Sequence, residues 1–343
     1  MDAALVAEDV RKRYGETTAL AGVSLSVDAG EVFGLIGPNG AGKTTLVRAL
    51  TGTTRYEGSI AVLGSSPTAV DRQRIGLLPQ SFSPPSRLTA RELIGYYGGL
   101  YEDPRPIEDV LADVGLEDDA DTWYEKLSGG QKRRSCVGTA LVNDPDVLFL
   151  DEPTTAIDPA GRRSLWRLID RLADGGTTVF LTSHSMAEVE RLADRVGLLR
   201  DGELVAVGTP AALIAEYGGE SRLVVRGSVA TREIAEELAR ETGFAVTAPA
   251  EDVVFSGVTP ADIPAAVEAL ESRGVAYESL TWTEPSLEDV YLQLTGEAFE
   301  GRRTPGSTAL STDPAAESTA EPAAEAEPEP GTESTPTADG GSE

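Results

Sequence analysis

The sequence of 343 residues contains one cysteine and one histidine, and its 29 Lys and Arg face 57 Asp and Glu. The single cysteine, Cys136, permits no internal disulfide, which agrees with a reducing compartment. Because no second cysteine or histidine lies near it in sequence, we interpret Cys136 as a small core residue rather than a nucleophile or metal ligand. The net charge of -28 argues against nucleic acid as the main partner.

Long apolar runs are also lacking. No window approaches the roughly 18 consecutive apolar residues of a membrane-spanning helix. The first ten residues, MDAALVAEDV, lack the basic and apolar regions of a signal peptide. We therefore expect an intracellular protein, with any membrane-spanning part on another chain.

The acidity is spread along the chain. From Thr304 onward there are nine acidic residues and no bases, which leaves 48 acids against 29 bases in the preceding part. Such self-repulsion is tolerable in strong salt, where the Debye length is about 3 Å at 1 M, so the composition favours the high-salt cytoplasm of a halophile. Residues 301–343 have almost no large apolar side chains to bury, and we predict a disordered acidic tail there.

Short apolar strands alternate with helical stretches over about residues 5–218, which is the pattern of an α/β layer fold. Strands are predicted at 32–37, 146–151, 178–183 and 195–202, and the first three are nearly all apolar, as buried parallel strands are. A capping box at Thr89-Ala-Arg-Glu92 predicts the start of a helix that continues through Tyr101. It belongs to a helical insertion of roughly residues 82–125. We assign residues 1–218 to one domain with a helical subdomain of about 82–145.

The pattern restarts after residue 220. Over residues 219–300 the order strand, helix, strand, strand, helix, strand predicts a small ferredoxin-like α+β domain. Residues 285–296, PSLEDVYLQLTG, are predicted as its closing helix. The six predicted elements are 222–227, 232–243, 244–248, 252–257, 263–274 and 276–282.

A phosphate-binding loop is indicated at GPNGAGKTT, directly after a predicted strand and before a helix. It fits G-x-x-x-x-G-K-[ST], with Gly37, Gly42, Lys43 and Thr44 at the fixed positions. Glycines let backbone N–H groups close around phosphate, the lysine reaches the β- and γ-phosphates, and the threonine hydroxyl meets Mg²⁺. A glycine-rich turn without a ligand is the alternative, and the flanking strand and helix disfavour it. The nucleotide-binding residues predicted here are Gly37, Pro38, Asn39, Gly40, Ala41, Gly42, Lys43, Thr44 and Thr45.

Two consecutive carboxylates, Asp151 and Glu152, follow the apolar strand in DVLFLDEPTT. Successive strand residues point in opposite directions, so the two acids can serve different tasks. We expect Asp151 beside Mg²⁺ and Glu152 to orient or deprotonate the attacking water. An acidic pair alone would more often mark the start of a solvated loop. The phosphate loop earlier in the sequence makes the catalytic interpretation the favoured one.

The only histidine, His184, ends another predicted strand in VFLTSHSM. The following Ser185-Met-Ala-Glu188 is predicted to form a capping box that starts a helix immediately behind it. This holds the histidine at the carboxyl edge of a parallel sheet, where α/β proteins gather their ligands.

The pentapeptide Leu127-Ser-Gly-Gly-Gln131 precedes Asp151 by some twenty residues. It is a second glycine-rich turn before a helix. With this motif the chain resembles the ATP-binding cassette (ABC) ATPases, and the motifs cover residues from about 5 to 218 in family order. The resemblance implies two cassettes packed head to tail, with each ATP between one phosphate loop and the other subunit. The residues expected to contact ATP in trans are Ser128, Gly129, Gly130, Gln131 and Asp158.

Three further positions gain a role from the resemblance. Gln80 resembles the glutamine that touches Mg²⁺, acts in catalysis and senses the membrane subunit, although alone it would be an ordinary loop residue. Tyr14 resembles the aromatic on which adenine stacks, although a turn tyrosine before Gly15 is nearly as good an interpretation. His184 resembles the switch histidine that bonds the γ-phosphate and ties it to Glu152.

The closing segment PSLEDVYLQLTG resembles the subfamily that powers drug, polysaccharide and other exporters, including the daunorubicin-resistance type. The resemblance implies ATP hydrolysis with Mg²⁺ at the cytoplasmic face of a membrane. It also implies a permease of about six transmembrane helices on a separate chain and a homodimer of cassettes. A non-transport cassette ATPase acting on ribosomes or DNA is the main alternative. One cassette, no sustained heptads and the acidity disfavour it. A regulatory module without turnover is disfavoured because Glu152 and His184 are both present.

Overall fold

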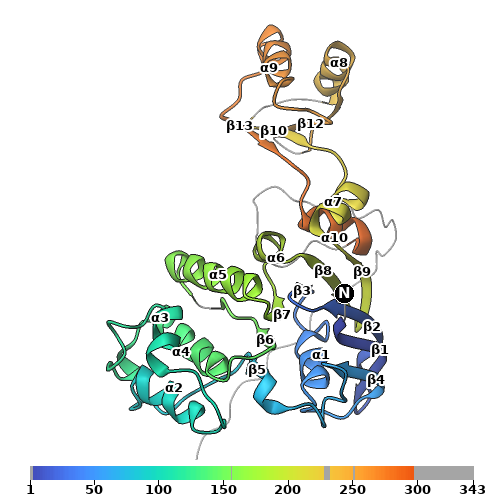
Figure 1. Cartoon of the computed structure of the whole chain (residues 1–343). Coiled ribbons are helices and arrows are strands. Elements are labelled where there is room, and N and C mark those ends of the chain that lie inside the picture. The colour runs from blue at the N-terminus through green and yellow to red at the C-terminus, as the bar shows by residue number, and fades with distance from the viewer. Residues whose placement is uncertain (1–2, 156, 228–231, 250–251, 297–343) are drawn as a thin grey trace, which may run out of the picture. The chain divides into compact units, whose positions relative to one another are not determined.

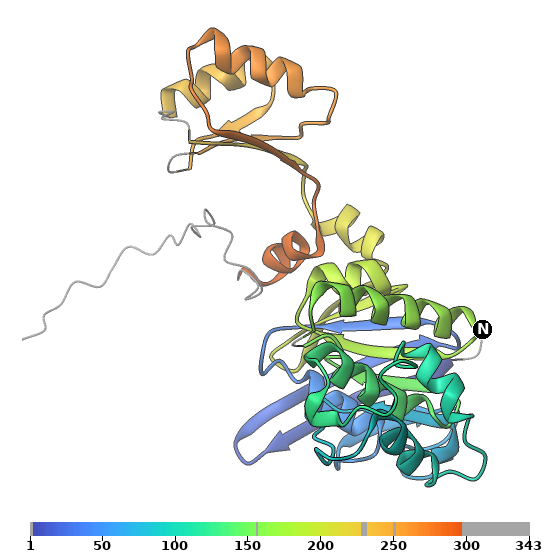
Figure 2. The same cartoon turned by 90° about the vertical axis from the view of Figure 1, so that its left-hand side faces the viewer.

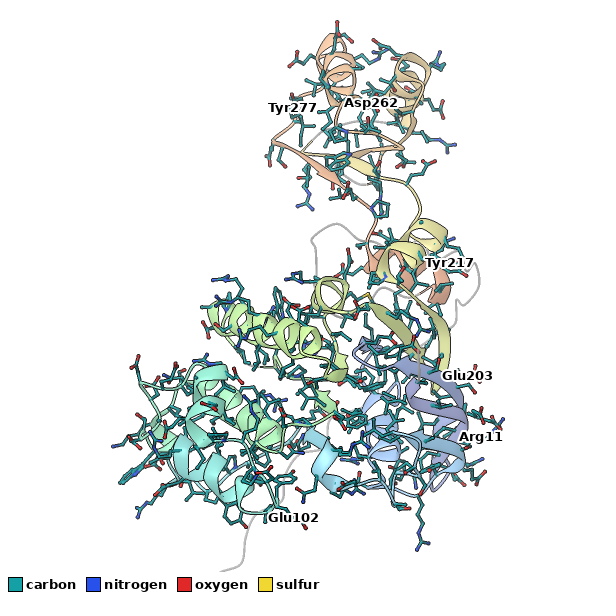
Figure 3. All side chains as sticks on the ribbon, viewed as in Figure 1. Arg11, Glu102, Glu203, Tyr217, Asp262 and Tyr277 are labelled. Carbon is teal, nitrogen blue, oxygen red and sulfur yellow. The ribbon has the colours of Figure 1, made fainter. Side chains whose placement is uncertain are left out.

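The computed structural model describes residues 3–155, 157–227, 232–249 and 252–296. The predicted disordered tail of residues 301–343 lies outside the described residues. Exposed charged side chains such as Glu102 and Glu203 project from the ribbon (Figure 3). No helix within the described ranges combines the length and apolarity needed to cross a bilayer.

A six-stranded sheet forms the centre of the first domain (Figure 1). Its neighbouring strands run parallel from β5 to β8, and β9 is antiparallel to β8. Each of the four predicted strands is present and ends within two residues of its expected bounds. In spatial order the strands are β5 (Ile75–Leu78), β6 (Val147–Asp151), β7 (Thr178–Ser183), β3 (Val32–Ile36), β8 (Arg195–Arg200) and β9 (Glu203–Gly208).

The apolar runs are continuous because both faces of the sheet are covered. Side chains alternate along a strand, so Val32 and Ile36 of β3 enter one core, whereas Phe33 and Leu35 enter another. In the second core the Phe33 ring stacks on Phe180 with centroids 5.6 Å apart. Every residue of β3, β6 and β7 is buried.

A three-stranded antiparallel sheet, which the sequence analysis did not separate from the α/β pattern, covers the second core. Its spatial order is β2-β1-β4. Val10 of β1, Val23 of β2 and Ile60 of β4 share this core with Leu46 of helix α1 (Lys43–Leu50). The strands are β1 (Ala3–Tyr14), β2 (Thr17–Asp28) and β4 (Glu57–Val62).

The helical insertion lies between β5 and β6 and contains α2 (Ala90–Gly98), α3 (Ile107–Asp113) and α4 (Gly129–Leu141), which group together in Figure 1. The capping box predicted at Thr89 is confirmed: Thr89 Oγ1 accepts from the Glu92 amide, and the Glu92 carboxylate accepts from the Thr89 amide. The helix ends at Gly98, earlier than expected. Helices α5 (Pro159–Asp174) and α6 (Met186–Leu192) precede β7 and β8 and pack on the first core.

The small domain has a four-stranded antiparallel sheet in the order β11-β12-β10-β13, with α8 and α9 on one face (Figures 1 and 2). Leu223, Phe255 and Leu238 belong to its separate core. Strand β13 begins three residues later than predicted. The elements are β10 (Arg222–Arg226), α8 (Arg232–Thr242), β11 (Ala245–Thr247), β12 (Asp252–Ser256), α9 (Ile263–Ser272) and β13 (Ser279–Thr283).

The closing helix α10 (Leu287–Thr295) packs against α6 and α7 (Pro210–Tyr217). Its buried Leu287, Val290 and Tyr291 lie in the core of the first domain. The sequence-based boundary at residue 219 grouped this helix with the small domain. Its apolar face instead belongs to the core of the first domain.

Candidate functional site

Four adjacent parallel strands bring four groups of the predicted site residues to one sheet edge. At the carboxyl ends of β5, β6, β7 and β3 follow, in turn, Gln80, the Asp151-Glu152 pair, His184 and the loop that begins at Gly37. The carboxyl edge of an open parallel sheet is the usual place for a ligand.

The loop from Gly37 leads directly into α1. Gly40 and Gly42 have φ of 87° and 108°, which L side chains rarely adopt. Gly42 is the N-cap of α1 and, having no side chain, leaves the first-turn amides without a side-chain cap. Unpaired helix amides carry partial positive charge, so this end of the helix can bind an anion.

Lys43 lies inside the loop, with its side chain folded over the loop's own backbone. Its Nζ donates to Gly37 O at 2.7 Å and Pro38 O at 3.1 Å, and it lies 4.0 Å from Glu152 Oε1. Burial lowers the pKa of the Lys43 ammonium, and attraction to the carboxylates of Glu152 and Asp151 partly offsets that effect. The loop thus holds a buried cation between carbonyl oxygens and a carboxylate.

The two acids diverge, as expected from their adjacent positions. Asp151 Oδ1 accepts from Thr182 Oγ1 at 2.5 Å, whereas the Glu152 carboxylate turns toward Lys43. Glu152 has φ of 50°, an uncommon left-handed conformation for a non-glycine residue. Its amide donates to both the backbone oxygen and the hydroxyl of Thr182, at 3.2 and 3.0 Å. Such conformations cost about 1–3 kcal/mol and persist where surrounding contacts hold them.

His184 follows β7, and its side chain is half-exposed. The ring Nδ1 lies 3.4 Å from Glu152 Oε2, which also accepts from Thr155 Oγ1 at 3.2 Å. The structure therefore brings the lone histidine to the second acid from a different strand.

The capping box predicted at Ser185 is wrong. Ser185 is the N-cap of α6, but its side chain makes no capping bond. The Glu188 carboxylate instead turns inward and accepts from Thr154 Oγ1 (2.9 Å), Ser183 Oγ (2.6 Å) and Trp166 Nε1 (3.0 Å). Donors from Thr154, Trp166 and the end of β7 compete successfully with the local helix end.

Gln80 is exposed on the loop after β5, where its Oε1 accepts from Thr44 Oγ1 at 3.4 Å. The hydroxyl of Thr44, the amide oxygen of Gln80 and the carboxylate of Asp151 offer oxygen donors of the type that Mg²⁺ prefers. Tyr14, at the end of β1, is 45% exposed, and Lys12 Nζ lies 4.9 Å from its ring centroid.

The second glycine-rich turn starts α4. Ser128 Oγ accepts from the Gln131 amide at 3.2 Å, and Gln131 Oε1 accepts from the Ser128 amide at 2.8 Å. Asp158 caps α5 through the amides of residues 160 and 161. A Cβ on Gly130 would lie 3.0 Å from Asp158 Oδ1, so the two helix starts are neighbours. Within one chain these side chains cap the starts of their own helices.

Residues 20–155 match the family model of ABC transporters. The linearmycin resistance ATP-binding protein LnrL of Bacillus subtilis is 36% identical over 311 residues, covering 86% of this chain and 99% of that protein. The Nod factor export ATP-binding protein I of Rhizobium sp. strain N33 is 37% identical, with 85% and 96% covered. The daunorubicin resistance ATP-binding protein DrrA3 of Streptomyces coeruleorubidus is 38% identical, with 86% and 97% covered.

The chain belongs to the ATP-binding subunits of ABC transporters. Its relatives by sequence include drug-resistance and export proteins, which confirms the resemblance to that subfamily. It is an ATPase whose hydrolysis of ATP is coupled to transport. Subunits of this family dimerise and work with a separate permease.

Solved structures agree with the cassette fold. The ADP form of the ABC transporter cassette MJ1267 is 26% identical with a TM-score of 0.56, covering 63% of this chain and 95% of that one. A dimeric post-hydrolysis state of the cassette MJ0796, bound to ADP and Pi, is 25% identical with a TM-score of 0.54. That match covers 60% of this chain and 98% of that one.

Thr182, Glu188 and Arg133 hold parts of the ABC cassette's site together, and none of them was predicted from the sequence. Thr182 binds both Asp151 and Glu152, and Glu188 joins the segments on which Glu152 and His184 lie. A threonine directly after the apolar run Val179–Leu181 of β7 was the available signal for Thr182. No signal marked Glu188, because its spacing from Ser185 also fits a cap.

Proposed function

We propose that two copies of this chain close head to tail on ATP and that hydrolysis reopens them to drive export through a separate permease. The observation that carries the proposal is the meeting of Lys43, Glu152 and His184 beside the phosphate loop. The amides at the start of α1 would bind the phosphates of ATP. Glu152 would act as the base, with His184 as its polar neighbour.

In the proposed reaction, Glu152 accepts a proton from water as the water oxygen attacks the γ-phosphorus of ATP. The bond from that phosphorus to the bridging oxygen breaks, which leaves ADP and phosphate. His184 orients the γ-phosphate against Glu152, and Lys43 neutralises charge on the β- and γ-phosphates. Thr44, Gln80 and Asp151 would hold Mg²⁺, which neutralises phosphate charge when bound. Tyr14 would stack on adenine.

The second half of each site would come from the partner copy, through Ser128–Gln131 and Asp158. The start of α4 is a helix N-terminus, whose partial positive charge can attract an anion. The dimeric state of the relative that is bound to ADP and Pi supports a dimer of this chain. Because the chain contains one cassette motif set, we favour a homodimer.

The proposal also covers the direction of transport, the permease, the location of the chain and the fold of the small domain. Relatives named for drug resistance and Nod factor export support export as the direction. We propose a permease of about six transmembrane helices, association with the cytoplasmic face of the membrane, and a high-salt cytoplasm that screens the net charge of -28. The strand order of residues 222–283 supports a ferredoxin-like small domain.

The test replaces Glu152 with glutamine in the full chain. Glu152→Gln keeps the side-chain shape but cannot accept the proton, so we expect ATP binding to persist and turnover to fall by at least about 100-fold. Glu31→Gln is the matched control: both glutamates are 8% exposed, and Glu31 lies before β3 at the opposite sheet edge. ATPase activity of Glu152→Gln above about a tenth of the wild type would overturn the assignment.

Coupling to transport is tested separately by co-expressing the chain with candidate permeases. An integral membrane protein that co-purifies with the chain and stimulates its ATPase activity would support transport. If no candidate permease binds the chain and stimulates its ATPase activity, the proposed six-helix export permease is overturned.

A further inference from the structure

Arg133 joins helix α4 to the backbone of Glu152, the proposed catalytic base. It lies on α4, five residues after the N-cap Ser128, and its side chain reaches the end of β6. Its Nε donates to Pro153 O at 3.0 Å, and its Nη2 donates to Asp151 O and Glu152 O, both at 2.9 Å. One guanidinium thus binds three consecutive carbonyl oxygens.

These three contacts surround the strained residue. In a regular strand successive carbonyls alternate in direction, so a single donor group cannot meet three in a row. They converge here at Glu152, where φ is 50°. The planar guanidinium presents donors in a rigid fork, which suits several fixed acceptors better than a single ammonium does. Arg133 and Thr182 therefore hold the carbonyl and amide sides of Glu152 respectively.

Helix α4 connects Arg133 to the glycine-rich turn at Ser128. Ser128 and Arg133 are five residues apart, which is a rise of about 7.5 Å along a helix. The Ser128–Gln131 capping box fixes the first turn, so a displacement of that turn moves the base of the Arg133 side chain. A misplacement of about 1 Å at a catalytic group can cost 100-fold in rate.

We propose that Arg133 is a positioning residue that couples the two ATP sites of the dimer. ATP held by Ser128–Gln131 in the partner's site fixes the start of α4. Arg133 transmits that position to the peptides around Glu152, which acts on the ATP in its own subunit's site. This inference rests on the proposed head-to-tail dimer, and it makes each site's turnover depend on ATP in the other.

The neighbouring arginine provides a matched control. Arg134 also donates to two backbone carbonyls, Val114 O at 2.8 Å and Gly115 O at 3.4 Å, but both lie in the helical insertion. Its Nη1 also lies near Gly130 and Gly161, at the starts of α4 and α5. Arg134→Gln therefore removes a guanidinium of the same kind from the same helix, close to the same helix start, without touching β6.

The experiment measures ATPase rate against ATP concentration for full-length wild type, Arg133→Gln, Arg133→Lys and Arg134→Gln. For the two Arg133 variants we expect kcat to fall by about 10-fold or more. The Hill coefficient should fall from above 1 in the wild type to about 1, because the two sites then act independently. Affinity for a fluorescent ATP analogue should stay within about 3-fold, because Arg133 contacts no loop residue from 37 to 45. Arg133→Lys keeps the charge and the fold but loses the fork, so it guards against misfolding of the glutamine variant.

Arg134→Gln should keep the wild-type Hill coefficient. A fall in kcat with an unchanged Hill coefficient in both Arg133 variants would reduce the residue to a structural role and overturn the coupling. Equal effects of Arg134→Gln would do the same. A wild-type enzyme without cooperativity that also tolerates Ser128→Arg would instead overturn the head-to-tail site itself, and with it the proposed function.

Discussion

The Glu188 carboxylate is almost fully buried near the site, and its removal gives a stability prediction that the structure makes quantitative. It is 1% exposed and accepts from Thr154, Ser183 and Trp166. Glu188→Ala removes all three acceptor contacts at once. The two hydroxyls can rotate toward other acceptors, but the indole N–H of Trp166 is fixed and can only donate.

A buried donor without a partner costs about 1–3 kcal/mol. Three such donors would cost up to about 9 kcal/mol, but partial exposure of Trp166, rotation of the two hydroxyls and release of a buried carboxylate reduce the loss. We expect Glu188→Ala to lower the free energy of unfolding by about 3 kcal/mol. For a domain of this size that lowers the melting temperature by about 6–12 °C.

Glu188→Gln separates the hydrogen bonds from the charge. Its amide oxygen can serve Trp166 while its NH₂ group faces the hydroxyls of Thr154 and Ser183, which are able to accept. We expect a loss of only about 1 kcal/mol. Thermal and urea unfolding followed by circular dichroism measure both variants. An alanine variant within about 1 kcal/mol of the wild type, or a glutamine variant as unstable as alanine, would refute the reasoning.

Two further predictions concern the loop and the cysteine. Gly40→Ala and Gly42→Ala each place a side chain on a residue in the left-handed conformation, which costs about 1–2 kcal/mol. A Cβ at position 42 also collides with the carbonyl oxygen of Ala19, whereas a Cβ at position 40 has no atom within contact distance. Gly42→Ala should therefore melt at a clearly lower temperature than Gly40→Ala, and equal melting temperatures would contradict this. Burial raises the pKa of the Cys136 thiol, so less of it is the reactive thiolate at a given pH. At about pH 8 a thiol reagent should modify the native protein at least about 10-fold more slowly than the urea-unfolded chain; comparable rates would show that Cys136 is accessible.

Features that depend on residues close together in the sequence could be predicted from it. The phosphate loop depends on local spacing between a strand and a helix, and the capping box at Thr89 needs only residues three apart. The apolar strands were visible because both their faces are buried. The strands β1 and β2 were not predicted, because buried and exposed positions do not alternate regularly along their twelve residues. Irregularities in their pairing, such as the one between Ala7 and Val10, interrupt the alternation.

The same limits apply to Glu188 and to α10. Ser185 and Glu188 fit a cap by spacing, yet donors 34 and 22 residues away in sequence, Thr154 and Trp166, bind the carboxylate. Helix α10 follows the small domain in sequence, but its buried residues lie in the first core. Periodicity reveals that a helix has an apolar face and does not say which surface covers it.

The sequence by itself determined the chemistry of the site: a glycine-flanked lysine, two successive carboxylates and one histidine, each at the end of a predicted strand. Only the tertiary structure decided how the acids are held. Thr182 reaches Glu152 from β7, Arg133 reaches it from α4, and the backbone between them adopts φ of 50°. That conformation is unfavourable for an isolated glutamate. It exists because contacts from segments 19 and 30 residues away outweigh the local preference, and spacing along the chain does not encode their direction.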